Sequence, residues 1–346
     1  MTDLKDYGYS AGMDSLPSGC IPARVTEVHR QLYKAICAHG EVSAGLKGSF
    51  LHETKNKSDF PAVGDFVRLK YNENGSSSIA GVMPRTSKFS RTDFSGHAAG
   101  YVKTVLEQVV AANFDYVFIL SSVNLDFNVN RTARYLTLAR QSGGIPVVVL
   151  TKVDLCGDCN RYIEETRRVA GDADVVVVSS RTGTGLESLA PYLMPGKTVV
   201  FLGMSGVGKS TLLNALAGQE LMAVQDIRED DARGRHTTTH RQLVRLPSGA
   251  LIIDTPGMRE LGLWNADEGI HAAFADVEAL IAQCRFSNCS HNNEPGCAVQ
   301  AALAQGSLPP KRWSRYLAQK RESAFVESKS GPAKSRKGKA KQQEDD

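Results

Sequence analysis

The chain has 346 residues, of which 42% are hydrophobic and 23% charged. These are globular values and exclude wholesale disorder. A single core stops growing near ~250–300 residues, so we expect two or three domains. The sequence has no apolar run long enough to cross a membrane and no basic start followed by an apolar core. We therefore expect neither a membrane partner nor a secretory signal, and a cytoplasmic location.

The net charge of +4 is unevenly distributed. Residues 311–346 carry 11 Lys and Arg against 5 Asp and Glu, so the rest of the chain is slightly acidic. A basic terminal segment is typical of proteins whose partner bears phosphates, such as a nucleic acid. The alternative is a solvated tail that only aids solubility.

The N-terminal third predicts a small barrel. Residues 1–18 are polar and irregular, and we expect a disordered arm. Residues 19–90 show short alternating segments broken by Gly, Asn and Ser, which predict an RNA-binding β-barrel of the OB-fold type, with an SH3-like barrel as the alternative. The expected strands cover 23–30, 33–37, 41–44, 66–70 and 79–82.

A short basic stretch follows the barrel. Arg85, Lys88 and Arg91 surround Phe89. Such a stretch can grip a phosphate backbone and stack a base. A charged connector between domains fits the same residues equally well.

Residues 91–263 alternate between helical patterns and buried strands. This repetition predicts an α/β domain with a mostly parallel sheet covered on both faces. The expected strands are 114–120, 145–150, 174–178, 198–202 and 250–253, and the expected helices 101–113, 130–142, 161–170, 186–193 and 211–217.

The remaining chain predicts helices and a tail. Residues 264–327 should form a helical domain, with helices over 270–282, 299–304 and 311–326. Residues 328–346 are rich in Lys and poor in apolar groups, and we expect them to be disordered.

The strongest motif is a phosphate-binding loop (P-loop). The run Gly203, Met204, Ser205, Gly206, Val207, Gly208, Lys209, Ser210, Thr211 fits G-x-x-x-x-G-K-[ST] between an expected strand and helix. Backbone N–H groups of such a loop point at phosphates, and the helix start adds positive charge. Lys209 should reach the β- and γ-phosphates, and the Ser210 hydroxyl should bind Mg²⁺.

Two further segments complete a triphosphate site. Asp254 at a strand end should hold the Mg²⁺ shell, and the Gly257 N–H can sense the γ-phosphate. A Thr of the run 237–239 can complete the Mg²⁺ coordination. We favour Thr239, followed by Thr238.

The base-reading motif indicates guanine. Thr151, Lys152, Val153 and Asp154 match [NT]-K-x-D directly after an apolar strand. Asp154 can accept two hydrogen bonds from guanine, and adenine offers no such donor pair. Lys152 can lie over the base, and Ser179 and Ser180 can back it. Thr replaces the commoner Asn at 151, which weakens one side-chain contact and leaves Asp154 in place.

The order of these motifs is inverted. In an ordinary GTPase the phosphate loop comes first, but here residues 151 and 179 precede it. The domain is therefore circularly permuted, which a compact domain tolerates when its ends lie close together. The γ-phosphate-sensing segment then leads directly into the C-terminal unit.

A third group of residues predicts a metal site. Cys284, Cys289, His291 and Cys297 supply three thiolates and one imidazole, a full tetrahedral set for a structural Zn²⁺. Buried thiols beside an unrelated His are the competing interpretation. Cys156 and Cys159 form an isolated C-x-x-C, which we take as a chance surface pair rather than a redox site.

The permuted order, the barrel in front and the Cys/His cluster behind resemble the RsgA (YjeQ) family of ribosome small-subunit-dependent GTPases, over roughly residues 20–325. The resemblance implies an OB-fold, a circularly permuted P-loop GTPase domain and a zinc-binding C-terminal domain. It also implies binding to the small (30S) ribosomal subunit and its 16S rRNA late in maturation, with subunit-stimulated hydrolysis of GTP to GDP and phosphate. We expect a monomer with Mg²⁺ and one structural Zn²⁺.

Hydrolysis also needs a group that positions the attacking water. Many GTPases carry Gln just after the D-x-x-G motif, but Met258 occupies this position. His236 is the candidate catalytic residue, since an imidazole can hold a water at neutral pH. It could instead contact only partner RNA. Two alternative functions also remain: a GTP-dependent RNA-binding module in which hydrolysis is incidental, and an ATP-using RNA remodeller.

Overall fold

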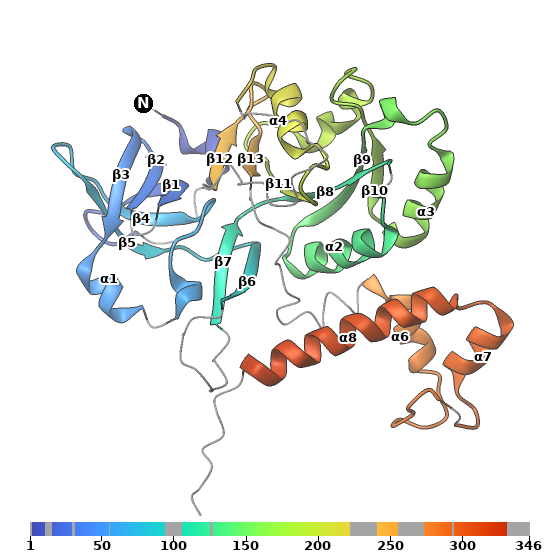
Figure 1. Cartoon of the computed structure of the whole chain (residues 1–346). Helices are drawn as coiled ribbons and strands as arrows, with labels where there is room; N and C mark the ends of the chain where they lie inside the picture. The colour runs from blue at the N-terminus through green and yellow to red at the C-terminus, as the bar shows by residue number, and fades with distance from the viewer. Residues whose placement is uncertain are drawn as a thin grey trace, which may run out of the picture.

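The computed structural model of the chain shows a barrel, an α/β domain and a helical C-terminal unit (Figure 1). It describes residues 2–10, 16–29, 32–54, 56–93, 106–124, 127–221, 241–254, 273–292 and 294–330. None of the described helices is both long and apolar enough to span a membrane.

The barrel has five strands, and alternate residues of each point into one core. In β5, for example, every second residue is buried. The strands run in the order β1-β2-β3-β5-β4, and a β1–β4 pairing closes the ring. Helix α1 (Gly48–Glu53) and the 3₁₀ turn Lys57–Asp59 lie between β3 and β4. The expected OB-fold is confirmed. Its strands are β1 (Ile21–His29), β2 (Leu32–Cys37), β3 (Gly40–Leu46), β4 (Phe66–Lys70) and β5 (Ser77–Val82).

The α/β domain contains a parallel sheet with an antiparallel edge, in the order β10-β9-β8-β11-β13-β12. Side chains alternate between two cores: Val200 and Leu202 of β11 face α2 and α3, and Val199 and Phe201 face α4. This confirms a sheet covered on both faces. The strands are β8 (Tyr116–Ser122), β9 (Ile145–Thr151), β10 (Asp174–Val177), β11 (Thr198–Leu202), β12 (Gln242–Arg245) and β13 (Leu251–Asp254). The helices are α2 (Val129–Gln141), α3 (Asn160–Ala170) and α4 (Lys209–Ala217), with 3₁₀ turns at Val153–Leu155 and Leu186–Tyr192.

The two sheets are continuous. Glu27 of β1 pairs with Gln242 of β12, which joins the barrel to the α/β domain in a single sheet of eleven strands. Since β12 pairs in turn with β13, only one strand separates the barrel from the strand that ends at Asp254. The barrel is thus directly connected to the phosphate-binding half of the domain.

The helix expected over residues 101–113 is wrong where the structure describes it. Leu106–Ala112 forms strand β7, paired with β6 (Lys88–Asp93). Short apolar runs fit both the helical and the strand periodicity, and here contacts across the strand pair decide the conformation. Lys88 Nζ lies 2.7 Å from Glu107 Oε1, and Arg91 donates to the Gln108 side chain.

Phe89 belongs to the core of the molecule. Its side chain is only 3% exposed and stacks on Phe114 at a centroid distance of 4.9 Å. A ring in this position cannot stack on a nucleic-acid base. The structure therefore favours the connector interpretation for the basic stretch.

The arm expected over residues 1–18 is ordered between residues 2 and 10. Leu4–Tyr7 forms a 3₁₀ turn with Leu4 buried. Arg24 Nη1 donates to the Tyr7 carbonyl, and Asp6 pairs with Arg245 of β12 at 3.1 Å. Contacts from distant segments therefore fix a stretch whose own composition favours no structure.

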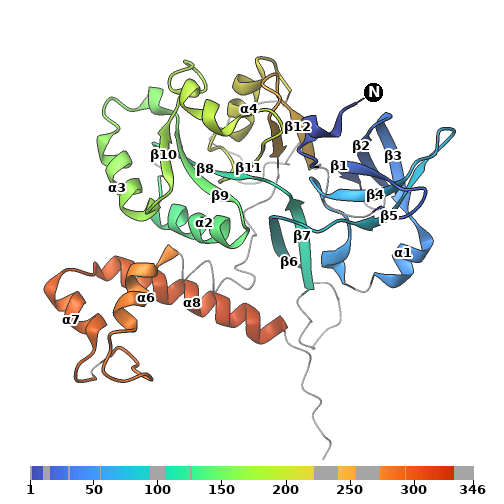
Figure 2. The same cartoon turned by 180° about the vertical axis from the view of Figure 1, so that it is seen from behind.

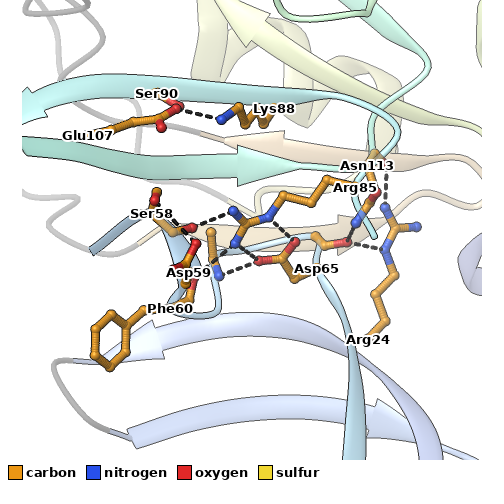
Figure 3. Close-up of polar contacts among 12 residues, drawn as sticks. Arg24, Ser58, Asp59, Phe60, Asp65, Arg85, Lys88, Ser90, Glu107 and Asn113 are labelled. Atoms are coloured by element: carbon orange, nitrogen blue, oxygen red, sulfur yellow. Dashed lines mark hydrogen bonds and ion pairs between the residues drawn. The ribbon is translucent and has the colours of Figure 1, made fainter. Parts of the chain in front are cut away.

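A buried polar network joins barrel and connector (Figure 3). Arg85 binds Asp65 through two hydrogen bonds, Nε to Oδ1 at 2.8 Å and Nη2 to Oδ2 at 2.7 Å. Arg24 donates to the carbonyls of Gly64 and Asn113. Burial lowers the pKa of Arg24 to about 10, so it stays charged at neutral pH. Each buried charge has partners, as its desolvation requires.

The C-terminal unit consists of α6 (Ala275–Ile281), α7 (Ala298–Gln305) and the long α8 (Pro310–Ser330). Figures 1 and 2 show α8 passing alongside α2. Phe274 and Tyr316 belong to the same core as α2 and lie edge to face. Because α8 continues to Ser330, the expected start of the disordered tail at residue 328 is wrong. Residues 331–346 lie outside the described part.

Candidate functional site

The phosphate loop begins where the fully buried strand β11 ends. Its residues 203–208 connect this strand to α4. Gly206 and Gly208 adopt φ angles of 76° and 101°, which only glycine takes at no steric cost. A Cβ on Gly203 would lie 2.9 Å from the Leu120 carbonyl oxygen, so the loop packs directly against β8.

Lys209 lies across the loop. Its Nζ donates to the carbonyls of Gly203 at 2.8 Å and Met204 at 2.6 Å. Ser205 and Gly206 are exposed, and Ser210 and Thr211 are half-buried in the first turn of α4. An ammonium group beside inward-turned backbone and a helix start is the arrangement that binds phosphates.

The base-reading residues lie at the ends of β9 and β10. Lys152 has a left-handed backbone, and Asp154 follows within a 3₁₀ turn and is exposed. The fully buried Ser179 donates its hydroxyl to Asp154 Oδ1 at 2.6 Å. Ser180 follows and is half-buried. One carboxylate oxygen is thus anchored, and the side chain remains accessible to a base.

Thr151 connects the base-reading and phosphate loops. Its side chain is buried, and Oγ1 donates to the Val207 carbonyl at 2.7 Å. From the sequence, we expected this Thr to make a weaker side-chain contact than the commoner Asn. The structure gives its hydroxyl a defined role, which holds the two loops in register across the end of β8.

We therefore expect Thr151→Val to weaken GDP binding about tenfold, because the isosteric side chain leaves the Val207 carbonyl without its donor, at a cost of about 1.4 kcal/mol. Thr151→Ser keeps the hydroxyl and should bind like the wild type. Titration calorimetry measures both. Equal affinities for the Val and Ser variants would contradict the role of this bond.

Asp254 ends β13, the parallel neighbour of β11. Its side chain is buried, and it lies at the same sheet edge as the phosphate loop. This is the position expected for a Mg²⁺-binding carboxylate. The other predicted residues of this half, His236, Thr238, Thr239 and Gly257, lie outside the described residues.

The predicted metal ligands converge. Cys284 follows α6, and Cys297 caps the N-terminus of α7. The four ligand atoms lie within 4.8 Å of one another. His291 Nδ1 lies 3.6 Å from the sulfurs of Cys284 and Cys297, which are 3.9 Å apart. Zinc bonds of about 2.0–2.3 Å in a tetrahedron place ligand atoms roughly 3.5–3.8 Å apart, so this set fits a metal ion.

Neighbouring polar groups hold the metal-ligand loop. Glu294 accepts hydrogen bonds from the Ser290 hydroxyl and from the backbone N–H groups of Ser290 and Asn292, and these bonds lower its pKa to about 2. Gln300 donates its side chain to the His291 carbonyl at 2.5 Å and its backbone N–H to the Cys297 sulfur. Such contacts orient ligands before metal arrives.

The C-x-x-C pair lies on the loop after Asp154. Burial, with a smaller contribution from Cys156, raises the pKa of Cys159 to about 11. Reactive redox cysteines have lowered pKa values. For Cys159 itself, this argues against a reactive thiolate.

A family model described as "RsgA GTPase" matches residues 82–264, more than half of the chain. The chain belongs to the RsgA GTPase family. It is accordingly a GTP-hydrolysing enzyme. It is 44% identical over 326 residues to the small ribosomal subunit biogenesis GTPase RsgA 2 of Lactiplantibacillus plantarum, covering 93% of this chain and 90% of the relative. The RsgA protein of Opitutus terrae is also 44% identical over 326 residues, with 91% and 87% covered.

Solved structures agree with the fold. YjeQ from Thermotoga maritima matches with a TM-score of 0.64 and 26% identity, over 88% of this chain and 98% of that one. YloQ, described as a circularly permuted GTPase, matches with a TM-score of 0.59 and 23% identity, over 91% and 98%. The permuted architecture expected from the motif order is confirmed.

Proposed function

We propose that this GTPase acts in late maturation of the small (30S) ribosomal subunit, binding the subunit and its 16S rRNA and hydrolysing GTP when docked. The relatives' names describe small-subunit biogenesis. The observation that supports nucleotide binding is the Thr151 hydrogen bond to Val207, which holds the base-reading loop and the phosphate loop together. With this role we propose a cytoplasmic location for the protein.

In this proposal each residue has a distinct role. Asp154 accepts the guanine N–H donors and Lys152 covers the base. Lys209 exchanges its two loop carbonyls for phosphate oxygens. Ser210 and Asp254, with Thr239 or Thr238, hold Mg²⁺, which neutralises charge on the β- and γ-phosphates. His236 positions the water, and Gly257 senses the terminal phosphate.

The metal cluster has a structural role. We propose that Cys284, Cys289, His291 and Cys297 bind one Zn²⁺. All four positions are protein ligands, which leaves no open coordination for a reacting water. The ion would fix the loop between α6 and α7 for contact with the subunit.

Phosphate release in the presence and absence of purified small subunits tests the proposal. Added subunits should raise the turnover of GTP many-fold, and GDP but not ATP should compete. His236→Ala should keep GDP affinity within twofold and lose the stimulation. Turnover that ignores the subunits would favour a binding module with incidental hydrolysis, and full stimulation of His236→Ala would remove this residue from the mechanism.

A further inference from the structure

A small polar hollow lies beside the phosphate loop, on the side that faces α2. Ser121 and Ser122 at the carboxyl end of β8 form one wall, Arg131 of α2 another, and Met204 and Ser205 of the phosphate loop a third. Its volume is about 20 Å³, enough for one group the size of a water molecule. The fold thus places Arg131 next to a loop more than 70 positions away in sequence.

The location of Arg131 on α2 is electrostatically unfavourable. Asn128 caps this helix by accepting the backbone N–H groups of Asn130 and Arg131, so Arg131 lies in the first turn. The positive end of a helix dipole disfavours a cation there. No acidic residue shares this turn. Within the described ranges, no hydrogen-bond acceptor or carboxylate contacts its guanidinium.

The C-terminal end of the same helix carries an arginine in favourable surroundings. Arg140 lies in the last turn of α2, where the dipole favours a cation. It donates to Asp172 and to the Ala170 carbonyl. Among the residues that the structure describes, Arg131 has no partner of this kind, and the dipole at its end of the helix disfavours a cation. Arg131 lies instead against the phosphate loop.

We propose that Arg131 binds the terminal phosphate of GTP and stabilises the charge that develops there during hydrolysis. This inference rests on the proposed function. Water attacks the γ-phosphorus, the bond to the β–γ bridging oxygen breaks, and the products are GDP, inorganic phosphate and a proton. The guanidinium contributes two or more N–H donors to the phosphoryl oxygens. An arginine supplied by the same chain raises turnover in other phosphate-loop GTPases by orders of magnitude.

The test compares two nucleotides on matched variants. Arg131→Gln removes the positive charge, and Arg131→Lys keeps the charge on a shorter side chain. Arg168→Gln on the exposed face of α3 serves as control. For each, calorimetry with Mg²⁺ gives the affinity for GDP and for guanosine 5′-(β,γ-imido)triphosphate, and single-turnover assays with small subunits give the hydrolysis rate. Thermal melting verifies folding.

We expect Arg131→Gln to bind GDP within twofold of the wild type, to bind the triphosphate analogue about tenfold more weakly, and to hydrolyse GTP at least a hundredfold more slowly. Arg131→Lys should fall in between, and Arg168→Gln should match the wild type. An equal loss for both nucleotides, or no loss for either, would overturn the proposal. Failure of the wild-type chain to bind any guanine nucleotide would instead refute the proposed function, and this inference with it.

Discussion

Replacing Asp154 by asparagine is expected to lower the affinity for GDP at least a hundredfold. The carboxylate accepts from the ring N–H and from the exocyclic amino group of guanine, and each hydrogen bond to a charged group contributes about 1.5–3 kcal/mol. An asparagine NH₂ would face those donors with a donor of its own. The amide oxygen can still accept from Ser179, so the loop itself should keep its geometry.

The same substitution should reverse the base preference. Xanthine carries a carbonyl where guanine carries its amino group, so an asparagine donor suits it. Titration with GDP and xanthosine diphosphate measures both effects. Asp158→Asn is the matched control, because Asp158 is exposed in the same loop and its carboxylate accepts from the Asn160 backbone N–H. If Asp154→Asn bound GDP within threefold of the wild type, Asp154 would not read the base.

Loss of the proposed Zn²⁺ is expected to unfold the loop between α6 and α7. Structural zinc contributes about 10–16 kcal/mol to the folding of small metal-binding peptides, and the proposed ion would crosslink this loop through its four ligands in the same way. Cys297→Ser separates metal binding from helix capping. Serine is itself a preferred N-cap, so α7 keeps a side-chain cap, with an oxygen in place of the Cys297 sulfur, while the metal loses a thiolate.

Elemental analysis and circular dichroism check this prediction. Wild-type protein should carry one zinc per chain, and Cys297→Ser should lose it during dialysis against a weak chelator, with a partial loss of helical signal. GDP affinity should remain, since the phosphate and base loops lie elsewhere. Cys20→Ser, at a half-buried cysteine outside the cluster, should retain full zinc. Zinc retained by Cys297→Ser would argue against a tetrahedral Cys₃His site.

The nucleotide site was predictable from the sequence wherever adjacent residues determine the backbone conformation. Glycines at 206 and 208 adopt the left-handed conformations that the loop needs. Asp154 and Ser179 follow apolar strands, so their positions at one sheet edge follow from parallel topology. The close spacing of the metal ligands limits how far apart they can lie.

Contacts between distant segments were not predictable. The apolar run at 106–112 fits a helix as well as a strand in sequence, and only its pairing with β6 makes it a strand. The N-terminal turn is ordered because Arg24 and Arg245 bind it. From the sequence, Thr151 resembled a weakened form of the base-reading motif, and only the structure shows its hydrogen bond to Val207. No sequence pattern marked Arg131 as a residue beside the phosphate loop.

This division has a physical origin. Adjacent residues impose the local conformations and the chemistry, namely the loop glycines, the strand-end carboxylates, the thiolate cluster and the permuted order. Which far-apart groups meet could be read only from the folded chain, because strand pairing and side-chain hydrogen bonds depend on how whole elements pack together. The bonded connection between the two nucleotide loops and the cation beside the phosphate loop belong to this second class.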